Sequence, residues 1–104
     1  MVLPPYEPVG CFRDGIPRVL PLILEIYPVN ETDLATSFAA IIHACATKAY
    51  QLGLWYFGVE YRSQCWGSLK GGMTYNKYGP SDFCLSNYSV GDVWTIFVYR
   101  YVEG

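Results

Sequence analysis

The four cysteines are the residues of this chain best suited to covalent chemistry: Cys11, Cys45, Cys65 and Cys84. None of them lies in the closely spaced Cys-x-x-Cys pair that structural zinc sites usually contain, and the single histidine is His43. An even number of cysteines without such pairs is typical of disulfide bonding, and four cysteines allow three pairings. We therefore expect two disulfides and no metal site.

Aromatic rings beside planar polar groups are the second candidate chemistry. The 104 residues include ten Tyr, five Phe and three Trp, and a core of this size cannot bury them all. An aromatic face stacks on the apolar face of a sugar, while amide and guanidinium groups bind its hydroxyls. The segment 61–78 has this mixture, and its predicted carbohydrate-binding residues are Tyr61, Arg62, Gln64, Trp66, Tyr75, Asn76 and Tyr78. The alternative is that Trp66 and Tyr78 pack in the core or at its rim.

Catalytic motifs are not found in the sequence. It contains no G-x-S-x-G, no H-E-x-x-H and no glycine-rich phosphate loop. Glu60 with Asp82 or Asp92 would supply the two carboxylates of a glycoside hydrolase, but their spacing does not favour this. The spacing of Asp82 and Asp92 is also unlike that of a calcium-binding loop. We predict a domain that is not an enzyme and has no cofactor.

Charge and hydropathy limit the partners. A net charge of −2 with only 15% charged residues gives no cluster of Lys and Arg for nucleic acid. The longest stretch without a charged residue, 34–47, is too short to span a bilayer. A hydrophobic content of 52% excludes a disordered chain.

Two glycosylation sequons indicate the compartment. They begin at Asn30 and Asn87, and together with the even cysteine count they predict an extracellular protein, either secreted or an ectodomain. The opening residues 1–6 lack the basic and apolar segments of a signal peptide, so we expect the sequence to represent a mature domain. A cytosolic protein with reduced cysteines is the alternative.

One amphipathic helix is the clearest element. Thr32 or Asp33 is a suitable N-cap, and Gly53 is a suitable C′ residue. His43 lies away from the centre of the apolar stripe and is expected in solvent. The stripe at helical spacing consists of Phe38, Ile41, Ile42, Cys45, Ala49 and Leu52.

The remaining elements read as strands and loops. Phe57, Val59 and Tyr61 alternate along one strand and are expected to face the helix. The last strand has apolar residues on both faces, which is typical of a central strand. We expect strands over 6–13, 56–61, 64–67 and 92–102, an edge strand or extended loop over 18–27, and surface loops over 68–89.

This order of elements predicts an α+β fold, with a single helix packed on a small twisted antiparallel sheet in one domain spanning 1–104. Cys45 then lies on the buried face of the helix, and Cys65 lies on the hairpin beneath it. We therefore expect the disulfides Cys45–Cys65 and Cys11–Cys84.

Several short sequences resemble the WSC domain, an extracellular cysteine-rich module. They are VGCFRD at 9–14, RVLP at 18–21, the cysteine-bearing helix, YFGVEY at 56–61, QCWG at 64–67 and VY at 98–99. The family typically has eight cysteines and a Cys-Tyr-Cys-Gly hairpin, whereas here Trp66 directly follows Cys65. The resemblance therefore implies a four-cysteine, WSC-like variant. The PAN/apple modules are a second resemblance.

The resemblance implies a module that binds glycans of the cell wall or cell surface. The alternative is a structural or adhesive module that contacts other extracellular proteins or further copies of itself. That alternative rests on the abundance of Tyr and the low charge, since protein interfaces are rich in aromatic and poor in charged residues.

Overall fold

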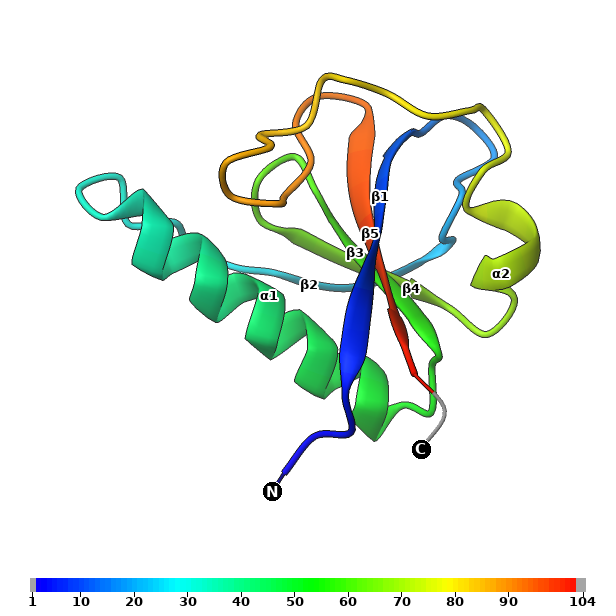
Figure 1. The fold of residues 1–104 in the computed structure, drawn as a ribbon, viewed down its shortest axis with the longest axis horizontal. Coiled ribbons are helices and arrows are strands. Elements are labelled where there is room, and N and C mark those ends of the chain that lie inside the picture. The colour runs from blue at the N-terminus through cyan, green and yellow to red at the C-terminus, as the bar shows by residue number, and fades with distance from the viewer. Residues whose placement is uncertain (1, 103–104) are drawn as a thin grey trace.

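A five-stranded antiparallel sheet carries one long helix on one face in the computed structural model, which describes residues 2–102 (Figure 1). The strand order is β1-β5-β3-β4-β2. The predicted α+β class is confirmed. Along the chain the elements are β1 (Tyr6–Arg13), β2 (Leu22–Ile26), α1 (Leu34–Gln51), β3 (Tyr56–Glu60), β4 (Gln64–Ser68), α2 (Gly71–Thr74) and β5 (Thr95–Tyr101).

The ends of α1 follow from local sequence. The Asp33 side chain caps its first turn by accepting a hydrogen bond from the Thr36 backbone N–H at 3.3 Å. Gly53 follows the helix with φ +71°, a left-handed conformation that favours glycine. His43 is exposed as expected, but Leu52 is exposed too, because it is the C-cap at which the chain leaves the helical stripe. The buried stripe is Phe38, Ile41, Cys45, Ala46 and Ala49.

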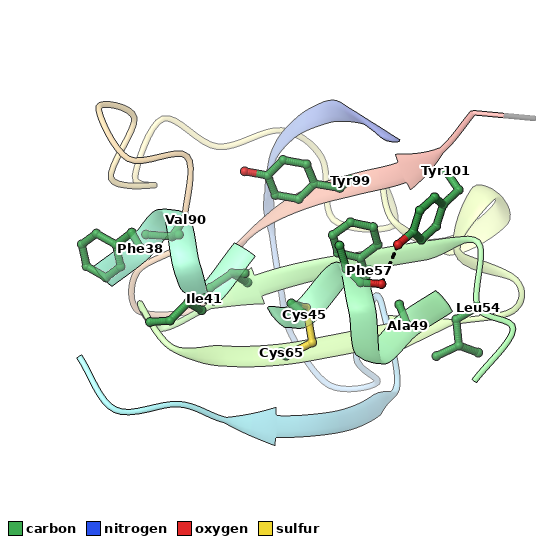
Figure 2. Packing of buried hydrophobic residues seen from close by; sticks show 12 residues of the cluster. Phe38, Ile41, Cys45, Ala49, Leu54, Phe57, Cys65, Val90, Tyr99 and Tyr101 are labelled. Atoms are coloured by element: carbon green, nitrogen blue, oxygen red, sulfur yellow. Dashed lines mark hydrogen bonds between the residues drawn. A yellow bond between two sulfur atoms is a disulfide. The ribbon is translucent and has the colours of Figure 1, made fainter. Parts of the chain in front are cut away.

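The main core lies between α1 and the sheet (Figure 2). Phe57 and Tyr99 from neighbouring strands stack with ring centroids 5.4 Å apart. Tyr101 is anchored by its hydroxyl, which donates to the Ala46 carbonyl of α1 at 2.6 Å. These contacts fix the helix across β3 and β5.

Both predicted disulfides are confirmed. Cys45–Cys65 joins α1 to β4 inside the main core. Cys11–Cys84 joins β1 to the loop before β5, across a sequence separation of 73. Each bond therefore joins two separate elements of the fold, and the loop that it closes restricts the unfolded chain.

The opposite face of the sheet has its own apolar cluster, which the segment after β1 and the α2 region cover (Figure 1). This burial on both faces confirms β5 as an interior strand. The expected loop over 68–80 is wrong in part, because Ser68 ends β4 and Gly71 begins α2. A Cβ atom on Gly71 would lie 2.3 Å from that of Tyr56, so α2 approaches β3 as only glycine allows. The buried members of the cluster are Phe12, Val19, Leu20, Trp66, Ile96 and Val98.

Two strand ends differ from prediction. β3 ends at Glu60, and Tyr61 does not face the helix; it lies in a turn with φ 48° and is 54% exposed. Hydrogen bonds from the Tyr61 and Arg62 N–H groups to the carbonyls of Asp92 and Gly91 hold this turn. β5 begins at Thr95 rather than at 92. These hydrogen bonds join residues far apart in the sequence. They end the strand pairing of β3 at Glu60, although the apolar alternation continues to Tyr61.

Among the strands of residues 2–102, β2 pairs with β4 alone, so it is the edge strand allowed by prediction. It follows Pro21, whose ring lacks the N–H that strand pairing requires. Within residues 2–102, no helix is long and apolar enough to cross a membrane.

Candidate functional site

A small polar cleft at the end of β3 is lined by two exposed aromatic residues. Tyr61 is 54% exposed, and Trp94, which directly precedes β5, is 49% exposed. The cleft has a volume of about 290 Å³ and offers a guanidinium, a carboxyl and an amide group. Its lining residues are Arg18, Glu60, Tyr61, Gln64, Val93 and Trp94.

Arg18 is held by two rings and two carboxyl groups. Its guanidinium carbon lies 4.8 Å from the ring centroid of Trp66 and 4.6 Å from that of Trp94, distances typical of cation–π contacts. Its Nη1 donates to Asp14 Oδ2 at 3.0 Å and to Glu60 Oε2 at 2.9 Å. The segment after β1 is thereby tied to the cleft end of β3.

The two carboxyl groups behind Arg18 titrate in opposite directions. Burial raises the pKa of Glu60 to about 9, and the neighbouring Asp14 carboxylate adds to the rise. Burial also acts to raise the pKa of Asp14, but hydrogen bonds from Glu60 and from the Val19 and Gly15 N–H groups outweigh it, so that pKa is lowered. At neutral pH, Glu60 is therefore a neutral acid, while Asp14 is an anion that balances Arg18.

Gln64 and Trp66 face the same side of β4. The indole Nε1 of Trp66 donates to Gln64 Oε1 at 3.2 Å, which fixes the orientation of the amide beside the cleft. Trp66 itself is only 9% exposed and packs against Ile96 and Val98 of β5. It contacts Arg18 from the core side and packs as the alternative interpretation of Trp66 expected, not as an exposed binding ring.

The predicted carbohydrate residues are thus divided among several places. Tyr61 and Gln64 line the cleft, and Trp66 lies beneath it. Arg62 points elsewhere: it donates to the Glu31 carboxylate at 2.9 and 3.2 Å. Only part of the predicted set therefore belongs to one site.

The other three predicted residues follow α2. Tyr75 packs on Phe12, with ring centroids 4.8 Å apart, and covers the second apolar cluster. The Tyr78 hydroxyl donates to the Pro17 carbonyl at 2.6 Å, and Asn76 is exposed. Tyr78 therefore packs as the alternative interpretation expected, and Tyr75, for which no such alternative was considered, also packs rather than lining the cleft.

Sequence reasoning missed Arg18 and Trp94 as residues of the site. The alternation of Trp94 with Ile96 and Val98 predicts that Trp94 is part of a strand. In the structure, Trp94 instead has a left-handed backbone, with φ 51°. The partner considered for Glu60 was Asp82 or Asp92, whereas its carboxyl lies against Asp14 and Arg18. No local pattern links positions 42 residues apart.

The glycosylation asparagines and possible metal ligands are the remaining features considered in the sequence. Asn30 and Asn87, the sequon asparagines, are both exposed, as glycosylation requires. Among residues 2–102, no group of three or more His, Cys, Asp or Glu side chains is placed to hold a metal ion.

Comparison with protein-family models, with curated proteins and with solved structures finds no match for this chain. The WSC and PAN/apple resemblances therefore stay predictions. The class that the structure establishes is an α+β fold with two disulfides, a pattern typical of extracellular proteins.

Proposed function

We propose that this protein is an extracellular carbohydrate-binding domain and that the cleft between Tyr61 and Trp94 is its binding site. The observation that carries the proposal is the pair of half-exposed aromatic residues that line a polar cleft. Rings of this kind stack on the C–H faces of a sugar. The amide of Gln64 and the guanidinium of Arg18 supply hydrogen bonds to its hydroxyls.

Preorganisation supports this assignment. Arg18 is already held by Asp14, Glu60 and two indole rings, so it loses little side-chain entropy when a ligand binds. The volume of about 290 Å³ is at the lower limit of small-molecule sites. We therefore expect the cleft to take one sugar unit at a time, such as the end of a chain.

The charge of the site favours neutral sugars. Asp14 balances the positive charge of Arg18, and Glu60 is uncharged at neutral pH because its pKa is raised to about 9. An acidic sugar would find no unbalanced cation in the cleft. Neutral hexosides and N-acetylhexosaminides are therefore the expected ligand class.

Binding to immobilised neutral polysaccharides, namely a β-glucan, a mannan and chitin, tests the proposal. We expect at least one to be bound, and Trp94→Ala to weaken that binding about tenfold, as loss of one stacked ring predicts. The matched control is Phe83→Ala, because Phe83 is an aromatic residue that is 73% exposed and does not line the cleft. Absence of binding to all three, or equal loss in the two variants, would contradict the proposal.

A protein-interaction role is the second candidate, and the edge strand β2 favours it. Its exposed side chains include Leu22, Ile23 and Ile26, and its outer edge is free to pair with another strand. Sedimentation over a range of concentrations tests this role. Self-association that Ile23→Lys abolishes supports it, and a monomer at all concentrations contradicts self-assembly.

A further inference from the structure

A second cavity lies at the opposite end of β3 and β5 from the cleft. Trp55 precedes β3 and Tyr101 ends β5, whereas Tyr61 and Trp94 flank these antiparallel strands at the other end. The N-terminal segment passes beside the C-terminal end of α1 in the same region (Figure 1). The cavity has a volume of about 320 Å³ and is lined by Gly53 and by Pro4, Tyr50, Leu54, Trp55, Tyr101 and Val102.

Three aromatic residues line this cavity: Tyr50 of α1, Trp55 in the connection before β3, and Tyr101 of β5. Tyr50 belongs to the last turn of α1, and its ring centroid lies 5.8 Å from that of Tyr101 at an interplanar angle of 52°. The Tyr101 N–H donates to the Trp55 carbonyl at 2.9 Å, which fixes these two residues relative to each other. Tyr50 and Trp55 are 44% and 50% exposed, so a ligand reaches both from solvent.

The electrostatics of the cavity favour a cation. The π faces of aromatic rings carry partial negative charge. The C-terminal end of α1, which Gly53 follows, adds the negative end of a helix dipole. In the part of the chain that the structure describes, no Lys, Arg, Asp or Glu lines the cavity.

The residues that line the cavity favour a quaternary over a primary ammonium group. A primary ammonium group has three N–H donors and needs acceptors for them, and a sugar needs partners for its hydroxyls. Among the described residues 2–102, no carboxylate or carboxamide side chain lines this cavity, in contrast to the cleft around Gln64. A quaternary ammonium group has no N–H donor, and aromatic faces recognise it through cation–π contact.

We infer that this cavity binds a quaternary ammonium group of the choline type through the exposed rings of Tyr50 and Trp55. The buried Tyr101 holds both in place, through its ring contact with Tyr50 and its hydrogen bond to the Trp55 carbonyl. The assignment does not depend on the carbohydrate-binding proposal, because the two sites share no lining residue. Two sources present this chemistry, namely the headgroup of a choline lipid and a soluble choline ester.

Amide NMR titration of the full chain tests the inference with a matched pair of probes. Choline and 3,3-dimethyl-1-butanol have the same shape, but only choline carries a charge. We expect choline to shift the Gly53, Leu54 and Val102 amides in a saturable way, and the neutral alcohol to bind about tenfold more weakly or worse. Equal binding of both probes, binding of neither, or shifts outside the cavity would overturn the inference.

Variants of Tyr50 separate the ring from its apolar bulk. Tyr50→Leu keeps an apolar side chain without a π face and should weaken choline binding about tenfold, whereas Tyr50→Phe should retain binding within about twofold. Leu52→Ala is the control, because Leu52 is exposed at the same helix end and does not line the cavity. Unchanged shifts for residues remote from the cavity verify folding. Tyr50→Leu binding choline as the wild type does would count against the inference.

Vesicle flotation distinguishes the two sources. Flotation with phosphatidylcholine vesicles but not with phosphatidylglycerol vesicles identifies a lipid headgroup. Binding of soluble phosphocholine without flotation identifies a soluble ligand. Binding of neither form overturns the inference.

Discussion

Arg18 Nη1 lies 2.9 Å from Glu60 Oε2 and ties the segment between β1 and β2 to the end of β3. Asp14 completes the group at 3.0 Å from the same nitrogen. This contact holds the polar floor of the cleft between Tyr61 and Trp94. It is both a source of stability and the scaffold of the proposed site.

Removing Arg18 leaves a buried carboxylate without its cation. Arg18→Met should destabilise the fold by roughly 3–5 kcal/mol, as expected when one partner of a buried ion pair is lost. Arg100→Met is the matched control, since the ion pair of Arg100 with Glu7 is exposed and contributes less than about 1 kcal/mol. Urea unfolding measures the free energy of unfolding of both variants. Equal losses would show that Arg18 stabilises the fold no more than the exposed Arg100 ion pair does.

The raised pKa of Glu60 predicts how stability changes with pH. Below the unfolded-state value of 4.5, Glu60 is protonated in both states, so its stabilising contribution is complete. As the pH rises towards about 9, the unfolded chain ionises while the folded chain keeps its proton, and stability falls. Each kcal/mol lost lowers Tm by roughly 4–8 °C.

Glu60→Gln isolates this effect, because glutamine is neutral at every pH. The variant should lose less Tm than the wild type between pH 5 and pH 9. Glu31→Gln is an exposed control that should follow the wild type. Parallel Tm curves for wild type and Glu60→Gln would mean that Glu60 ionises normally in the fold.

The two disulfides should contribute unequally. In the chain-entropy model, removing Cys11–Cys84 destabilises by roughly 4 kcal/mol and removing Cys45–Cys65 by roughly 3 kcal/mol, because the first closes the longer loop. Double Cys→Ala variants, unfolded in urea, measure both values. Cys45 and Cys65 lie in the main core, so their replacement also leaves a cavity and adds to the entropic loss. A Cys45–Cys65 variant as stable as the wild type would contradict this assignment.

Gly71 fixes the approach of α2 to the sheet. Gly71→Ala should destabilise by about 1–3 kcal/mol, since its Cβ would overlap that of Tyr56 and force α2 away from β3. Met73→Ala in the same short helix should be nearly neutral, because Met73 is 87% exposed. Thermal unfolding compares the stability of the two variants. A Gly71→Ala variant as stable as the wild type would show that α2 does not pack closely against Tyr56 of β3.

Local sequence predicted the helix and the cysteine pairing well. The helical spacing of Phe38, Ile41 and Cys45 placed the buried face, and Asp33 and Gly53 marked its ends. The strand alternation then put Cys65 beneath Cys45. These features depend on short-range periodicity, which the sequence displays directly.

The candidate site was predicted only in part. Tyr61 and Gln64 were found from residue type, but Arg18 joins Glu60 across 42 positions, and no periodicity reports such a contact. Tyr61 and Trp94 adopt left-handed backbone conformations without being glycine, so turn propensity did not reveal them. Tertiary hydrogen bonds impose the Tyr61 turn, and they become visible only in the folded chain.

The most direct test of carbohydrate binding uses the three tryptophan indole N–H signals in one NMR titration with neutral oligosaccharides of glucose, mannose and N-acetylglucosamine. Trp94 borders the cleft, Trp66 lies beneath it, and Trp55 lies at the far end of the sheet. We predict that at least one oligosaccharide shifts the Trp94 signal in a saturable way and leaves the Trp55 signal in place. No shift with any of them, or a shift of Trp55 alone, would contradict the account.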